Sequence, residues 1–139
     1  MPQVTVTKIV EGESHVVLKV WMQNTEGTGE LVNYPIFSPA DCSPTRAGNK
    51  PTFRIMQMWY GCVWYDVTLG FSALVPNQVW TIARDCDSHN DFRSFGGITD
   101  PGVYDNPPGQ NYGTLLLSTN GFNVLGSQGS LILELRKNN

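Results

Sequence analysis

The chain has 139 residues, of which 15% are charged, 40% hydrophobic and 11% aromatic, with 14 Gly and 9 Pro. This length is enough for one hydrophobic core, and the composition is typical of a turn-rich globular protein and not of a disordered one. Nine Lys and Arg against 12 Asp and Glu give a net charge of −3, which argues against a basic face for binding nucleic acid.

The low charge, the lack of long apolar runs and the cysteine spacing each lead to a further expectation. A soluble monomer usually has about 25–35% charged residues on its surface, so the low charge indicates that part of this surface is covered in an assembly. The chain has no apolar run of about 18 residues and no signal-peptide pattern, so we expect neither secretion nor a membrane partner. Cys42, Cys62 and Cys86 lack metal-ligand spacing and are expected to be free thiols, with one disulfide as the alternative.

Two strands joined by a tight turn are expected at the start of the chain. Residues 4–10 and 14–22 alternate with period two, and residues 11–13 form a turn between them. This pattern predicts an N-terminal β-hairpin. One face of its second strand should consist of Val16, Leu18, Val20 and Met22.

A long loop is expected in the second quarter of the chain. After a turn at residues 24–29, residues 30–34 are predicted as a short or edge strand that ends where Pro35 removes a ladder donor. Residues 38–51 hold three prolines and little apolar periodicity. Because long loops in compact domains usually make contacts or carry function, we predict a contact arm here. Its candidate contact residues are Ser43, Pro44, Thr45, Arg46, Asn49 and Lys50.

The middle of the chain is the most apolar part and is expected to form central strands. Residues 53–60 and 63–71 are rich in the large aromatic side chains that favour strands, and residues 78–84 add a further strand. Most of these aromatics are expected in the core. Tyr60 and Trp64 are the candidates to face outward, where aromatic rings on a β-sandwich could stack on sugars.

Residues 85–110 are rich in turn formers and are predicted to be an ordered loop. Residues 114–118 and 130–136 then predict a second pair of strands around Asn120 and Gly121. About eight short strands predict an all-β fold, with residues 1–139 forming one domain: a β-sandwich, jelly-roll-like, with long ordered loops.

The densest group of polar residues lies at 85–91, which begins like a calcium-binding loop. Asn90 stands where that loop needs Gly, and Gly96 stands where it needs a bidentate Glu. We therefore expect these side chains to hold their own turn, with no metal. With only His15 and His89, no nucleophile elbow and no phosphate-binding loop, the sequence predicts no catalytic residues and no cofactor, so the chain is not expected to be an enzyme.

Four parts of the sequence resemble small accessory proteins of tailed bacteriophage heads, known as cement or decoration proteins. They are residues 4–9, residues 59–61 with 64–66, residues 89–97 and residues 128–137. The resemblance extends over nearly the whole chain and carries no catalytic residues. It implies a β-rich virion structural protein, often a homotrimer, that is made in the host cytoplasm and binds the major capsid protein on the outside of the phage head.

Two alternatives to a cement protein stay open at the level of the sequence. One is a tail or neck structural protein of similar fold. The other is a carbohydrate-binding β-sandwich module.

Overall fold

The computed structural model describes residues 3–12, 14–25, 27, 29–38, 52–62, 65–72, 77–83, 87–99, 113–122 and 125–138. These residues form ten strands and one short 3-10 helix, which confirms the predicted all-β fold. The elements are β1 (Gln3–Glu11), β2 (His15–Gln23), β3 (Tyr34–Phe37), β4 (Thr52–Cys62), β5 (Asp66–Phe71), β6 (Asn77–Ile82), β7 (Asp87–Asp91), η2 (Arg93–Phe95), β8 (Ile98–Thr99), β9 (Leu115–Asn120) and β10 (Gln128–Asn138).

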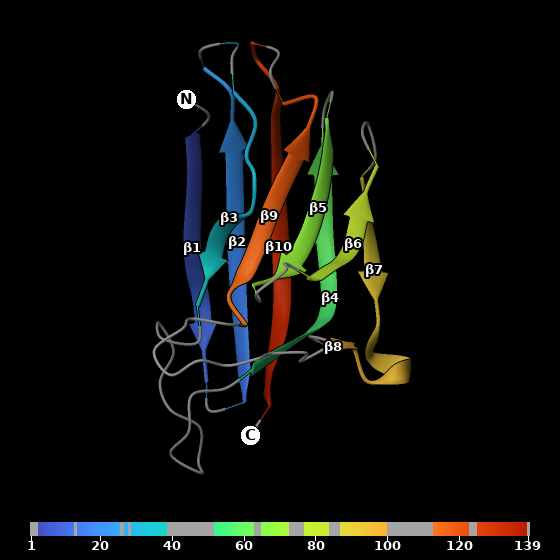
Figure 1. Ribbon diagram of the computed structural model, residues 1–139. Coiled ribbons are helices and arrows are strands. Elements are labelled where there is room, and N and C mark those ends of the chain that lie inside the picture. The colour runs from blue at the N-terminus through green and yellow to red at the C-terminus, as the bar shows by residue number, and fades with distance from the viewer. Residues whose placement is uncertain are drawn as a thin grey trace.

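The strands form two antiparallel sheets that pack face to face (Figure 1). The larger sheet has the order β1-β2-β10-β4-β7, with β8 paired to β4, and the smaller sheet has the order β3-β9-β5-β6. Without β1 and β8, the two four-stranded orders β2-β10-β4-β7 and β3-β9-β5-β6 are those of a jelly roll. The chain therefore forms a β-sandwich of the predicted kind.

The predicted N-terminal hairpin is present, and its second strand lies inside the larger sheet. β1 and β2 pair from Gln3 opposite Gln23 to Glu11 opposite Val16. Burial of a large apolar side chain contributes about 1.5–3 kcal/mol, so the inner face of β2 is a major part of the core. The four residues predicted for that face, Val16, Leu18, Val20 and Met22, are all fully buried.

A β-bulge in β4 decides which of its side chains face the core. Ile55 and Gln57 pair with the consecutive residues Leu135 and Glu134 of β10, so Met56 is the extra residue. An extra residue reverses the alternation of a strand. Ile55 is therefore buried before the bulge and Met58 after it, whereas Trp59 is exposed.

Three local predictions were wrong. The third strand begins at Tyr34 and includes Pro35, which the sheet accommodates because β3 is an edge strand. Residues 87–91, predicted as loop, form β7 against β4. The last two long strands do not form a hairpin, because β9 and β10 lie in opposite sheets.

Asn24, at the end of β2, contacts the segment that leads from β9 to β10. Its side-chain amide donates to the Phe122 carbonyl, and its backbone amide donates to the Ser127 carbonyl over 2.9 Å. Its own carbonyl accepts from the Gly126 amide over 3.0 Å. These bonds hold Phe122, Gly126 and Ser127 at the end of β2, next to the start of β10.

Candidate functional site

An exposed tryptophan and a histidine lie together on the outer face of the six-stranded sheet. Trp59 of β4 pairs across the strands with His89 of β7. Their rings stack with centroids 4.8 Å apart and an angle of 3° between planes. The stack covers one face of the indole, yet Trp59 remains 38% exposed. The two stacked rings therefore form an aromatic surface on the solvent-facing side of the sheet.

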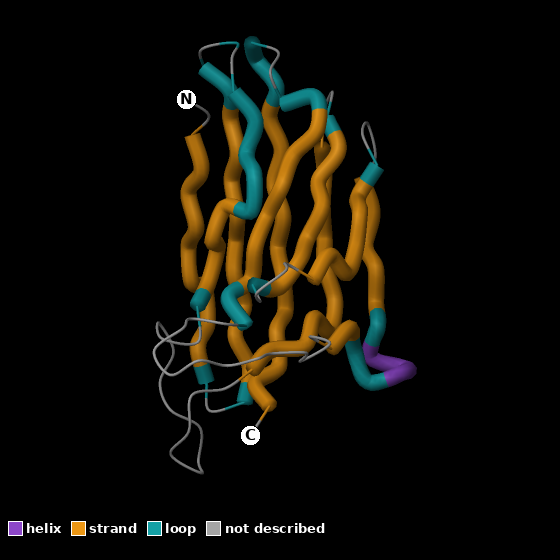
Figure 2. Tube along the Cα trace, viewed as in Figure 1, coloured by secondary structure: helices purple, strands orange, loops and turns teal. Residues whose placement is uncertain are grey.

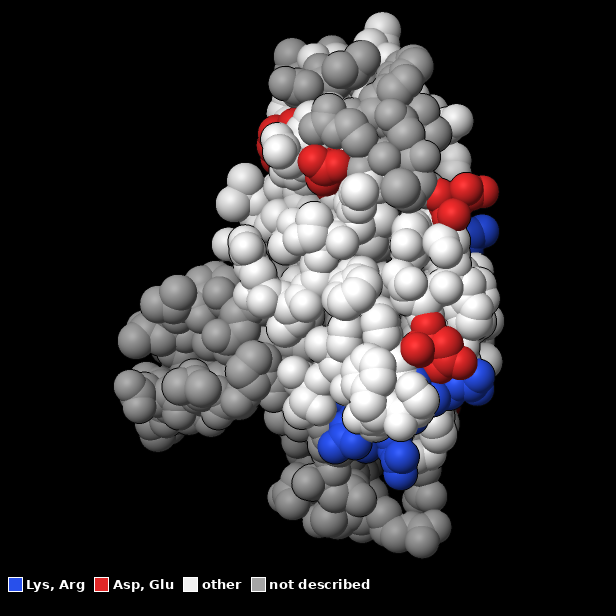
Figure 3. Space-filling view, turned by 90° about the vertical axis from the view of Figure 1, so that its right-hand side faces the viewer, with Lys and Arg blue, Asp and Glu red and all other residues white. Residues whose placement is uncertain are grey.

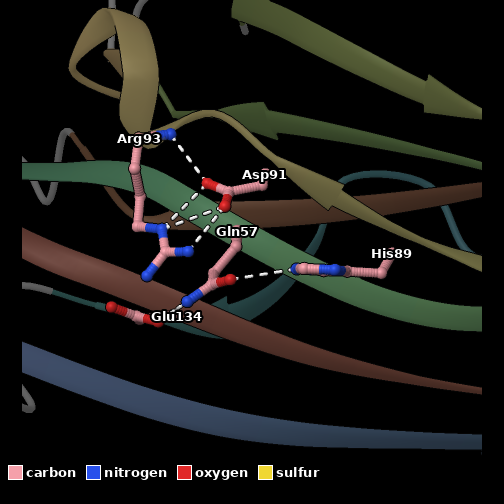
Figure 4. A network of polar contacts seen from close by, with 5 residues as sticks. All are labelled: Gln57, His89, Asp91, Arg93 and Glu134. Carbon is pink, nitrogen blue, oxygen red and sulfur yellow. Dashed lines mark hydrogen bonds and ion pairs between the residues drawn. The ribbon is translucent and has the colours of Figure 1, made fainter.

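A chain of polar contacts fixes the His89 ring (Figure 4). The side chain of Gln57, which is buried between the neighbouring strands, donates from its amide nitrogen to Glu134 Oε2 of β10. Its amide oxygen is thus left to accept from His89 Nε2 over 2.9 Å. This bond places a proton on Nε2 of His89. The imidazole of His89 is therefore held by two contacts, the hydrogen bond to Gln57 and the stack on Trp59.

Asp91 and Arg93 form an exposed ion pair beside this chain (Figure 4). Arg93 donates from Nε to both Asp91 oxygens, from Nη2 to Oδ2 over 2.6 Å, and from its backbone amide to Oδ1 over 2.9 Å. These hydrogen bonds to the ionised carboxylate lower the pKa of Asp91 to about 2. The pair therefore closes the turn between β7 and η2 at ordinary pH.

The described part of the polar segment 85–91 forms a strand and not a turn. Asp85 and Cys86 lie outside the described residues, and Asp87 to Asp91 are extended instead of forming the predicted turn. In a strand, successive side chains point to opposite faces of the sheet, so Ser88 and Asn90 point away from Asp87, His89 and Asp91. Among the described residues, no three His, Cys, Asp or Glu side chains gather in one place. His89 Nε2 is engaged in its hydrogen bond to Gln57 Oε1.

Tyr60, one of the two aromatics predicted to face outward, does not do so. Tyr60 is half-buried, packs against the core and accepts a hydrogen bond from Asn90 over 3.1 Å, because the bulge at Met56 directs it inward. Trp64 lies outside the described residues. Tyr65 is fully buried, as expected for a core aromatic, and contacts Phe122 with ring centroids 4.4 Å apart.

Sequence reasoning missed both of the tryptophans that face outward from the larger sheet. Trp59 was expected in the core, and Trp21 was not considered as a functional residue. Trp21 lies on β2 between the buried Val20 and Met22 and is 38% exposed. The period-two pattern of β2 already indicated this orientation.

The predicted contact arm lies outside the described residues, as do its candidates Ser43, Pro44, Thr45, Arg46, Asn49 and Lys50. Of residues 38–51, the structure describes Ser38. Ser38, where the arm begins, accepts a hydrogen bond from Thr114 Oγ1 over 3.4 Å. Thr114 comes directly after Gly113, the first described residue beyond the other long stretch outside the described residues, 100–112. One end of each long segment is therefore anchored at the same end of the sandwich (Figure 2).

Charged side chains are sparse on the surface around β6, β7 and η2. Figure 3, a view from this side, shows small separate clusters of both signs with uncharged surface between them. A shallow open depression lies along β6, lined by Gln78, Val79, Trp80 and Thr81. This side therefore has no extended field of one sign.

Comparisons with family models, curated proteins and solved structures each give no match to this chain. None of the helical structure in the described residues is long and apolar enough to cross a membrane.

Proposed function

We propose that this protein is a virion structural protein that binds the outside of a tailed-phage capsid as a homotrimer and stabilises the coat-protein lattice. The sequence resemblance to head decoration proteins suggests this role, and the jelly-roll strand order is one that viral capsid proteins share with lectins and cupins. The role needs neither a catalytic site nor a deep pocket, because many weak contacts across a lattice add up to tight attachment.

The observation that carries the proposal is the common anchoring of the two long segments. Ser38 borders residues 39–51, Thr114 lies two residues beyond residues 100–112, and the two side chains contact each other. Both segments therefore start or finish at one end of a stable sandwich. Loops grouped in this way on a rigid scaffold can engage a neighbouring protein without disturbing the core.

Exposed apolar side chains at the same end support the proposal. Ile9 and Val10, near the end of β1, are 51% and 52% exposed, and Phe95 of η2 is 67% exposed. β1 and β7, the strand that precedes η2, are opposite edges of the larger sheet, so Phe95 forms a separate exposed site from Ile9 and Val10. Exposed apolar side chains of this size can contact other proteins. We therefore expect this end, together with the arm, to face the coat protein.

The test is sedimentation of the protein with empty shells of the phage that encodes it. Native protein should sediment alone as a trimer and bind the shells to saturation. A variant with residues 43–50 replaced by eight Gly and Ser residues keeps the loop length, so the fold should be retained. This variant should no longer bind the shells.

Two results would contradict the proposal. Full occupancy of the shells by the Gly-Ser variant would show that the arm is not the contact. Native protein that sediments as a monomer and does not bind shells would refute the capsid role itself.

A further inference from the structure

Two tryptophans lie on the outer face of the larger sheet. Each belongs to a row of residues that pair with one another across the strands, and the two rows are neighbours. Trp21 pairs with Ser130 of β10, which pairs with Gly61 of β4. Trp59 stands in the adjacent row, two residues before Gly61. Since strands are spaced about 4.8 Å apart, the two tryptophans are separated by about 10 Å across the sheet. A ligand that contacts both indoles must therefore be extended.

The surface between the tryptophans is formed by β10 and β4, with Ile132 beside Trp59 and with Ser130 and Gly61 in the row of Trp21. Ser130 is small, and a Cβ on Gly61 would meet only the Asp87 Cβ, at 3.8 Å. No large side chain of this row thus rises between Trp21 and Asp87. We call the strip formed by Trp21, Ser130, Gly61 and Trp59 the tryptophan trough.

The trough is preorganised on the side of Trp59. His89 stacks on this indole, and the hydrogen bond from His89 to Gln57 fixes the imidazole in turn. Gln57 is itself held by Glu134. A ligand therefore meets a ring whose rotamer is already restricted, which lowers the entropic cost of binding.

The polar surroundings of the trough indicate the chemistry of its ligand. Exposed Lys19 and Asp87 border it with opposite charges, and Asp91 is neutralised by Arg93. Such a balance does not favour a charged ligand. Ile132, which pairs with both Lys19 and Trp59, supplies an apolar surface between the indoles, and Ser130 supplies a hydroxyl beside it. Apolar ring faces alternating with hydrogen-bonding groups match a sugar chain, which presents CH faces and hydroxyls.

We propose that the tryptophan trough binds a neutral oligosaccharide of several sugar units. This activity is additional to capsid attachment and uses a different surface, since the arm anchors at one end of the sandwich and the trough lies on a sheet face. A protein on the particle surface with such a site would hold the particle to glycan-bearing material.

Isothermal titration calorimetry of the purified protein with cellohexaose, chitohexaose and maltohexaose tests the proposal. At least one hexasaccharide should bind with a Kd of about 1 mM or tighter. Glucose and N-acetylglucosamine should not bind, because one ring cannot reach both indoles. Trp21→Ala and Trp59→Ala should each weaken binding about tenfold, the loss expected for one aromatic stacking contact.

Two further variants separate the trough from general effects on the protein. Gly61→Leu places a side chain in the trough and should abolish sugar binding without removing either indole. Phe95→Ala removes an exposed aromatic ring outside the trough and should leave sugar binding unchanged. All four variants should keep the far-ultraviolet circular dichroism of the native protein.

The proposal is wrong if none of the three hexasaccharides binds at about 10 mM, a concentration well above the expected Kd. It is also wrong if binding survives both tryptophan substitutions. Shell sedimentation of Trp59→Ala, run in parallel, should remain native. The sugar site and the capsid role can therefore fail independently.

Discussion

At the scale of single residues, Gly129 is where the core tolerates least change. A Cβ at this position would overlap Tyr65 Oη and lie 2.8 Å from the Gly61 carbonyl oxygen. Tyr65 cannot move aside, because it is fully buried against Phe122, and its hydroxyl contacts Met22 Sδ at 3.9 Å. Gly129→Ala should therefore lower the free energy of unfolding by about 1–3 kcal/mol, as overpacked cores do.

Urea denaturation measures this difference, and Gly61→Ala is the matched control on the adjacent strand. Its new methyl group would have the Asp87 Cβ 3.8 Å away as its nearest neighbour. The control should stay within about 0.5 kcal/mol of the native protein. Equal stability of the two variants would contradict the account of the Tyr65 packing.

Asp91 offers a second test at the residue scale, through its titration. The Arg93 hydrogen bonds lower the pKa of Asp91 to about 2 in the folded state. A lowered pKa means that the pair stabilises the fold at pH values above the unfolded pKa, about 3.9. This contribution is then lost as the pH falls toward 2.

Nuclear magnetic resonance titration of the Asp91 carboxyl group should give this low pKa in the native protein. In Arg93→Ala, the pKa should rise toward the ordinary value. Arg93→Lys should give an intermediate value, because a lysine keeps the charge but lacks the paired donors of the guanidinium group. An unchanged pKa in Arg93→Ala would show that the ion pair does not form in solution.

At the scale of elements, the sequence predicted those strands that bury alternate apolar residues. β2 is the clearest case, since its Val, Leu and Met residues alternate with polar ones. β7 could not be found in this way, because all five of its residues, Asp87 to Asp91, are polar. It forms because β4 offers an unpaired edge, and because buried Phe92 anchors its end through a 2.8 Å bond from its backbone amide to the Met56 carbonyl.

The candidate site was only partly predictable, because one inserted residue sets its geometry. Ile55 and Met56 are both apolar, so hydrophobicity does not reveal which residue is the bulge. The bulge decides whether Trp59 or Tyr60 faces outward, and the sequence interpretation chose Tyr60. The neighbour of Trp59 across the strands, His89, lies in the strand that was expected to be loop. Their stack could therefore not be anticipated.

At the scale of the whole molecule, period-two patterning does not say which sheet a strand joins. β9 and β10 follow each other closely, which favours a hairpin, yet they lie in opposite sheets. The segment between them is hydrogen-bonded to Asn24, about a hundred positions earlier in the chain. Long-range hydrogen bonds of this kind leave no local signal in the sequence.

The charge of the whole molecule leads to a prediction about how it attaches to a shell. A net charge of −3 over 139 residues and mixed small clusters of charge give no strong electrostatic attraction. Exposed apolar side chains such as Ile9, Val10 and Phe95 are the expected contacts instead. Raising NaCl from about 0.1 M to about 1 M shortens the Debye length from roughly 10 Å to roughly 3 Å.

Shell occupancy should therefore change by less than about twofold over this range, because apolar contacts are not screened by salt. The measurement is sedimentation of shells with saturating protein at both salt concentrations, with shells alone as the control for their integrity. Release of most of the protein at the higher concentration would show that ion pairs hold it. In that case Arg46 and Lys50 of the predicted arm become the first residues to substitute, because they are its only basic side chains.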